Sequence, residues 1–265
     1  MNIIRQSLVG LCLAVFALIP VRAQTPVTDP SPAVTIVTTP SYVSVYMFRG
    51  TEIGAQSIQP SVSYTYKALF LEVWGNTPFL KNGRLPGQPG AEIDPQGSYT
   101  VSINDSLSIQ PGFTWYNYSR PVDGDGLYRS TFEPNLGVSY TVEGVTISPK
   151  AYYDVVLHGP TYELNVTHTV PIKALDTEID FLGTIGSYEQ TDVVNGSVPT
   201  VKSWGNYWLA GFTVPLQYGK HSQVSIGWAY TKGTDAYTKQ AGIPKEVNVA
   251  AVGRGVTTIS YAWAF

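Results

Sequence analysis

The C-terminal stretch Gly255–Phe265 reads GVTTISYAWAF, and it decides the fold class. Successive side chains of a β-strand point to opposite faces, so this stretch has one apolar, increasingly aromatic face and one small, polar face. The first face ends with Tyr261, Trp263 and Phe265, whereas the other holds only Ser, Thr and Ala after Val256. A soluble β-sandwich would bury the apolar face in a core. A lipid-facing strand with aromatic residues at a membrane boundary fits the pattern better.

The same two-residue alternation recurs along the chain. Leu107, Ile109 and Phe113, for example, alternate with Ser108 and Gln110. The pattern predicts an all-β fold, a transmembrane antiparallel up-and-down β-barrel of about twelve strands. The predicted strands lie near 41–50, 57–66, 69–76, 97–104, 106–118, 130–142, 145–155, 161–171, 175–188, 205–217, 222–232 and 254–265.

The connections between these predicted strands alternate in length. Odd-numbered connections are the longer ones, such as 77–96, 189–204 and 233–253, whereas even-numbered ones are short, such as 67–68 and 143–144. Outer-membrane barrels have short periplasmic turns and longer extracellular loops. Nothing in a soluble β-sandwich requires its connections to alternate in length. The alternation therefore favours a membrane barrel.

Residues 1–23 are predicted to be a cleaved signal peptide, with an apolar stretch at 8–19 and a cleavage site after 21–23. Residues 24–40, rich in Pro and Thr, are predicted to be a periplasmic leader, and residues 41–265 the barrel. We therefore expect the protein in the bacterial outer membrane, with membrane lipid as its surroundings.

Composition supports this class and excludes some partners. Only 13% of the residues are charged, about half the usual globular share, and the chain has 18 Tyr and 6 Trp. Losing Arg5 and Arg22 with the signal peptide lowers the 16 Lys and Arg to 14, against 19 Asp and Glu. This negative balance argues against nucleic acid as a partner. The only cysteine, Cys12, is lost too, so the mature chain has no disulfide.

Part of the sequence resembles a known family. The segments Tyr46-Met47-Phe48-Arg49-Gly50 and Val73-Trp74-Gly75-Asn76, with Pro60 and Tyr64 between them, are similar to the N-terminal signature of the TorF family. This is a group of porin-like bacterial outer-membrane proteins of unsettled function. The sequence departs from that signature at Trp-Gly-Asn, where a Ser-Asn is expected, and at Thr51, where Ile or Val is expected. The resemblance implies a barrel and a pore, and it supplies no substrate.

The aromatic C-terminus carries a second resemblance. Phe265 with Tyr261 and Trp263 before it resembles the C-terminal signal of bacterial outer-membrane barrels. The resemblance implies the barrel-assembly machinery as a partner. We therefore expect these three residues to act as an assembly signal.

Charged residues inside the predicted strands are expected to face the lumen. A basic residue on the lipid face near the midplane costs roughly 2–4 kcal/mol, and an acidic one costs less. The channel-lining residues predicted in this way are Arg49, Glu72, Glu133, Lys150, Asp154, Glu163, Glu178 and Asp180. They suit either a charged constriction that selects solutes or a set of ion pairs that braces the barrel. Because acids outnumber bases, we expect weak cation preference for any pore.

Three classes of function are compatible with these patterns. The favoured one is a porin-like channel for passive diffusion of small hydrophilic solutes or ions. The alternatives are a non-conducting structural or binding barrel of the adhesin or receptor type and an outer-membrane lipid hydrolase. His168 is predicted to face outward, but no Ser stands next to it in a nucleophile motif and no G-x-S-x-G occurs. We therefore expect no enzyme, and we expect no metal site and no cofactor.

Two aromatic clusters are predicted at the outer ends of strands: Trp115, Tyr116 and Tyr118, and Trp204, Tyr207 and Trp208. Membranes favour aromatic girdles at this level, so we expect these rings to lie at the lipid interface. Stacking against carbohydrate is the lesser alternative.

Overall fold

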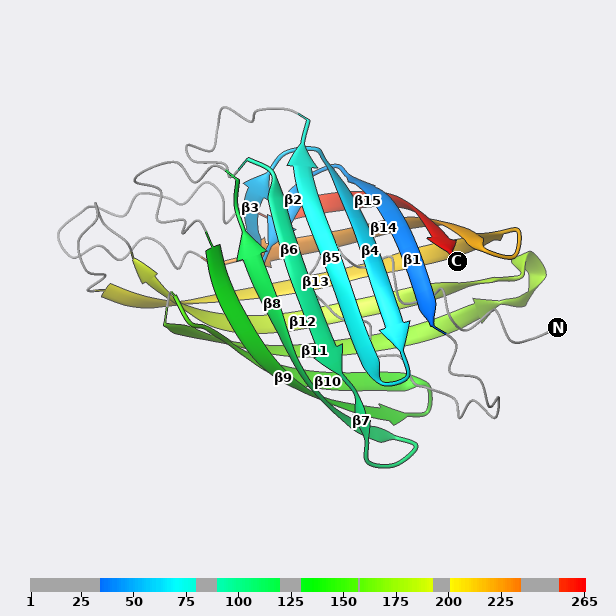
Figure 1. The fold of residues 1–265 in the computed structure, drawn as a ribbon, viewed down its shortest axis with the longest axis horizontal. Coiled ribbons are helices and arrows are strands. Elements are labelled where there is room, and N and C mark those ends of the chain that lie inside the picture. The colour runs from blue at the N-terminus through cyan, green and yellow to red at the C-terminus, as the bar shows by residue number, and fades with distance from the viewer. Residues whose placement is uncertain (1–33, 80–89, 120–129, 157, 193–200, 235–252) are drawn as a thin grey trace.

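The computed structural model describes residues 34–79, 90–119, 130–156, 158–192, 201–234 and 253–265. Strands form one closed wall (Figure 1). The wall strands are β1 (Thr35–Val43), β4 (Ser57–Tyr66), β5 (Leu69–Pro78), β6 (Glu92–Tyr99), β7 (Val101–Ser102), β8 (Leu107–Asn117), β9 (Ser130–Val142), β10 (Val145–Asp154), β11 (Gly159–Ile172), β12 (Thr177–Asp192), β13 (Val201–Tyr218), β14 (Ser222–Gly233) and β15 (Arg254–Ala264). A separate hairpin consists of β2 (Tyr46–Phe48) and β3 (Thr51–Gly54).

The barrel closes through two sets of pairings. β1 pairs antiparallel with both β4 and β15, and β6 pairs with both β5 and β8. β7 continues β6 after Thr100 and pairs with the same neighbour, β8, so the two pieces are one interrupted strand. The wall is therefore a closed antiparallel barrel of twelve strands. This confirms the predicted fold class and strand number.

Helical structure is limited to one 3-10 turn, Lys173–Leu175, within the described residues. No helix in those ranges is long and apolar enough to cross a membrane.

The C-terminal strand shows how alternation builds the wall. In β15, Thr258, Ser260 and Ala262 are buried inside the barrel, whereas Ile259 and Trp263 are exposed on the outside. Apolar side chains cover the outer face of the other strands in the same way, for example Val62, Leu136, Ile185, Phe212 and Ile226. A closed ring satisfies the backbone of every wall strand within the protein, which hydrocarbon requires.

Two predicted strand positions are wrong. The first strand was expected at 41–50, but β1 begins at Thr35, inside the range 24–40 predicted as a leader, and ends at Val43. The fourth strand was expected at 97–104, but β6 begins at Glu92. Both strand starts were missed where polar or Pro-rich sequence hides the two-residue period.

The two ends of the barrel differ, as the sequence predicts. Even connections are tight, and at 67–68 and 143–144 the residues Lys67, Glu143 and Gly144 have positive φ. We call this the short-turn end and the opposite one the long-connection end. Both described chain ends lie at the short-turn end, where the Phe265 N–H donates to the Ile36 carbonyl oxygen at 2.9 Å.

Candidate functional site

The hairpin β2–β3 leaves the wall and folds into the barrel. The last β1–β4 pair is Val43 with Ser57, and the chain leaves the wall ladder after Ser44, whose N–H still donates to the Thr257 carbonyl oxygen at 3.0 Å. Arg49 and Gly50 form the two-residue turn, with φ of 47° and 76°. Two adjacent positive φ values are typical of the type I′ turns that join tight hairpins. The hairpin lies toward the end of the barrel away from the C-terminus (Figure 1).

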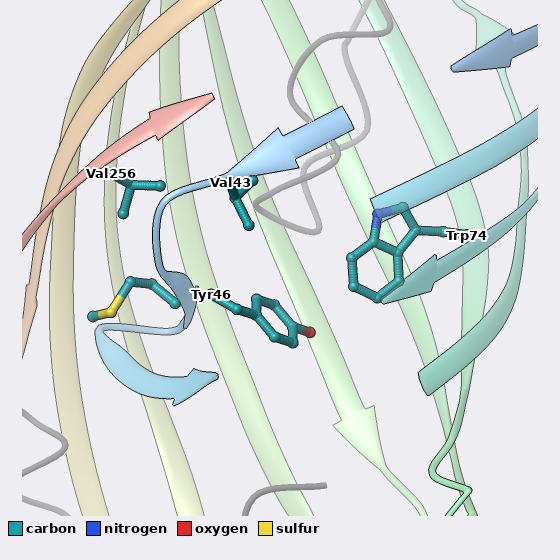
Figure 2. Packing of buried hydrophobic residues seen from close by; sticks show 5 residues of the cluster. Val43, Tyr46, Trp74 and Val256 are labelled. Carbon is teal, nitrogen blue, oxygen red and sulfur yellow. The ribbon is translucent and has the colours of Figure 1, made fainter. Parts of the chain in front are cut away.

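Apolar packing anchors the first arm of the hairpin to the inner wall. Tyr46 and Met47 are buried in one cluster with Val43, Trp74 and Val256. The Tyr46 and Trp74 ring centroids are 5.7 Å apart. Figure 2 shows these side chains converging from β1, β2, β5 and β15. The hairpin is therefore packed in place and does not hang loosely in the lumen.

The turn reaches the wall on the far side of the lumen. The Arg49 guanidinium donates two hydrogen bonds to the Glu133 carboxylate of β9, at 2.9 and 2.8 Å. The Glu133 side chain is only 1% exposed, and it also accepts a 3.0 Å hydrogen bond from the Tyr116 hydroxyl. Paired, bidentate geometry of this kind is among the stronger side-chain interactions. Phe48 packs edge-on against the Tyr116 ring, with the two ring centroids 5.8 Å apart.

Glycines allow the turn to approach β13 and β14 closely. A Cβ on Gly50 would lie 2.5 Å from the Gly233 Cα and 2.7 Å from the Tyr207 Cβ. A Cβ on Gly233 would in turn lie 2.7 Å from the Gly50 carbonyl oxygen. Only residues without a side chain fit this contact.

The second arm of the hairpin is held by another ion pair. The Arg254 Nε donates to the Glu52 carboxylate at 2.7 Å, at the start of β15. Ion pairs to β9 and to β15, both remote in sequence, thus hold the hairpin in place.

A network of charges and tyrosines surrounds the turn. Glu163 accepts hydrogen bonds from the hydroxyls of Tyr152, at 2.5 Å, and Tyr207. The Lys150 ammonium lies 4.9 Å from the Tyr152 ring centroid, and the Arg49 guanidinium lies 5.2 Å from it. Arg49, Lys150 and Glu163 therefore meet around the shared Tyr152 ring.

The remaining predicted lining residues lie apart from this network. Asp154 accepts from the Thr131 hydroxyl at 2.5 Å, close to the long-connection end. Glu72 accepts from the Gln96 amide at 2.5 Å. Asp180 accepts from Thr169 at 2.6 Å, and Glu178 is two residues nearer the start of β12, at the short-turn end. A channel-lining role for all eight residues stays a prediction.

Sequence analysis missed four charged residues in the lumen: Glu52, Glu92, Asp94 and Arg254. Glu92 and Asp94 are buried on the inner face of β6, a range expected to be loop. Their alternation with exposed Ile93 is the signal that identifies them as inward-facing.

The predicted aromatic girdle is partly wrong. Trp115, Trp204 and Trp208 are exposed on the outer wall, as expected. Tyr116 and Tyr207 are instead buried in the lumen, where they bind the two glutamates. Their odd–even offset from the tryptophans places them on the opposite face of the strand.

His168 is exposed on the outer face near the short-turn end, and its Nδ1 lies 3.0 Å from the Gly144 carbonyl oxygen. Within the described ranges, no group of three or more His, Cys, Asp or Glu side chains is placed to hold a metal ion.

The sequence matches no protein-family model and no curated protein sequence. Solved structures share the fold. The NanC porin has a TM-score of 0.53 and 11% identity, covering 86% of this chain and 98% of its own. An outer membrane channel from Pseudomonas putida F1 has a TM-score of 0.50 and 9% identity, covering 89% and 97%. The KdgM porin has a TM-score of 0.48 and 11% identity, covering 87% and 99%. The chain is thus a closed twelve-stranded β-barrel that shares its fold with the NanC porin and the Pseudomonas putida channel.

Proposed function

We propose that this barrel is a porin-like channel through which small hydrophilic solutes or ions diffuse passively. The observation that carries the proposal is the inward hairpin. It narrows a lumen lined by polar side chains, and it places Arg49 opposite Glu133, Glu163 and Lys150. Charged groups facing each other across a narrowed pore are a common source of solute selection.

The TorF resemblance supports the same proposal. The residues that carry it, 46–50 and 73–76, build the hairpin turn and the Tyr46–Trp74 contact. They are therefore the residues on which the constriction depends, and we propose that the chain belongs to that family.

Two further expectations belong to this proposal. The signal peptide 1–23 and most of the leader lie outside the described residues. We propose that the peptide is removed, and N-terminal sequencing of protein from the outer membrane tests this. We also propose that the barrel-assembly machinery recognises Phe265 and the two aromatic residues of its face.

A non-conducting structural barrel is the second candidate, because the pairs Arg49–Glu133 and Glu52–Arg254 brace the walls as well as line a path. Single-channel recording of purified protein in a planar bilayer separates the two. A porin gives stepwise conductance in KCl, with a reversal potential in a salt gradient that reports selectivity. If no conductance is recorded at any voltage, the result supports the non-conducting structural barrel.

A further inference from the structure

The outer face of the barrel is almost free of charge. Among the outward-facing side chains of the wall strands that the structure describes, only His168, Glu189 and Lys232 are basic or acidic. Glu189 has an interaction partner of its own, whereas no hydrogen bond, ion pair or ring contact engages the Lys232 ammonium within the described residues. Lys232 is therefore the free positive charge on this part of the outer face.

Lys232 lies at the rim of the barrel. Its strand β14 ends one residue later, at Gly233, so the side chain is at the long-connection end, and it is exposed. A lysine is costly at the membrane midplane but tolerated near the boundary. There its aliphatic stem lies along apolar surface while the ammonium reaches the polar headgroups.

Two aromatic residues flank Lys232. Trp208 of β13 pairs directly with Lys232 and is 43% exposed. The ring centroids of Trp208 and Tyr230 are 5.4 Å apart. The Tyr230 hydroxyl lies where a Cβ on Gly253 would be, and the β14–β15 register makes Gly253 the neighbour of Lys232 on β15. Lys232 thus has an indole on one side and a phenol hydroxyl on the other.

These three side chains present hydrogen-bond donors to the surroundings. The Lys232 ammonium and the Trp208 indole N–H can only donate, and the Tyr230 hydroxyl can donate as well as accept. No side-chain hydrogen bond occupies any of the three donors within the described residues. We call Lys232, Trp208 and Tyr230 the outer donor patch. Its natural complement is an anionic acceptor, since charge-assisted hydrogen bonds are the stronger ones.

The surroundings of the outer donor patch indicate which anion it meets. Long connections mark the extracellular end of an outer-membrane barrel. Aromatic side chains gather at the membrane boundary, and Tyr162 and Trp204, with centroids 6.3 Å apart, extend this aromatic band over β11 and β13. At that level, basic side chains attract the anionic headgroups of lipids.

We propose that the outer donor patch binds the phosphate group of one lipid of the outer leaflet and holds it at a fixed position on the barrel. The inference goes beyond the proposed channel function and does not depend on it. Phe212 and Trp228, both exposed and with ring centroids 6.4 Å apart, lie closer to the membrane core on the same two strands. Acyl chains of the bound lipid would lie along them. A neutral headgroup would leave the ammonium without a counter-charge.

The first test measures lipid binding to the full barrel by native mass spectrometry. Protein released from detergent is titrated with phosphorylated lipid A and, separately, with lipid A from which phosphatase has removed the phosphates. We expect one lipid A to be retained per barrel, with an apparent Kd at least about fivefold lower than that of the dephosphorylated lipid. Equal retention of the two lipids would overturn the proposal.

The second test removes donors from the outer donor patch. In K232Q we expect the apparent Kd for lipid A to rise about fivefold, as for the loss of one basic residue beside an anionic membrane surface. The control is K220Q, because Lys220 is exposed in the β13–β14 turn at the opposite end of the barrel.

A second pair of variants tests the indole. W208F keeps an aromatic ring but removes the N–H, so it should also weaken lipid A binding. W115F is its control, because the Trp115 indole N–H already donates to the Ser130 hydroxyl at 2.5 Å. Folding of each variant is checked by heat-modifiable migration.

The remaining outcomes decide between a lipid and a protein partner. Unchanged lipid A binding in both K232Q and W208F would overturn the proposal. A change in the number of barrels per complex in K232Q, with lipid binding unaltered, would show that the patch contacts a second protein chain and would also overturn the lipid site. None of these measurements requires conductance, so failure of the channel function and failure of the lipid site are distinguishable.

Discussion

Arg49 and Glu133 are 84 positions apart in the chain, yet the guanidinium of one donates to both carboxylate oxygens of the other, at 2.9 and 2.8 Å. This pair joins the tip of an inward hairpin to β9, on the far wall of the barrel. The pair holds the β2–β3 hairpin across the lumen. Solute passage and barrel stability should therefore both respond to it.

Replacing Glu133 with Ala tests the Arg49–Glu133 ion pair. The substitution leaves a largely buried Arg49 without its partner, and breaking such a pair costs about 3–5 kcal/mol. We expect lower stability against urea in lipid vesicles and a larger, noisier single-channel conductance, because the hairpin tip is released. In R49A/E133A the loss should be smaller than the sum of the two single losses. Additive losses would show that the two residues do not interact.

Gly50→Ala tests the close approach of the turn to the wall. The positive φ alone costs a non-glycine residue roughly 1–2 kcal/mol, and the new Cβ would lie 2.5 Å from the Gly233 Cα. We expect a displaced hairpin, detected as reduced urea stability and altered conductance. Gly183→Ala is the matched control, because nothing lies within 4 Å of its Cβ position. Similar behaviour of the two variants would contradict the contact.

The surplus of carboxylates in the lumen predicts the ion selectivity of the proposed channel. Wild type should prefer cations weakly in a KCl gradient, since rings of acidic side chains favour cations. E133Q and E163Q should shift the reversal potential toward anions, and K150Q should shift it toward cations. E143Q, in an exposed turn, should leave it unchanged. Anion preference in wild type would show that these carboxylates do not control the permeation path.

Neighbouring residues of β15 test which face meets lipid. Ile259 is exposed on the outside, and Thr258 faces the lumen. Ile259→Arg should destabilise the barrel by about 2–4 kcal/mol, the cost of a basic residue near the membrane midplane. Thr258→Arg should cost less in the same urea titration. The reverse order would invert the assignment of faces.

The C-terminal aromatic residue tests assembly. Phe265 is exposed, and its ring lies 6.5 Å from that of Trp263. Deleting Phe265 or replacing it with Asp should reduce the yield of folded barrel in outer-membrane fractions, measured by heat-modifiable migration. Phe265→Tyr keeps an aromatic ring and should assemble normally. Wild-type yield for F265D would exclude a role in assembly.

The sequence by itself determined the class of fold, the strand number and the direction in which most side chains point. A two-residue period is local, and Tyr261, Trp263 and Phe265 reveal it without reference to any other part of the chain. The alternation of short and long connections can also be followed along the chain, so it distinguished the two ends of the barrel.

Only the tertiary structure decided where the hairpin β2–β3 lies. Sequence analysis extended the first strand through Gly50, because the alternation in 46–50 resembles that of a wall strand. Its departure into the lumen depends on partners in remote strands: Glu133, Trp74 and Arg254. Such contacts arise from closure of the ring, which brings together positions that no local period relates. Alternation therefore predicted which way a side chain points, and the closed barrel determined what it meets there.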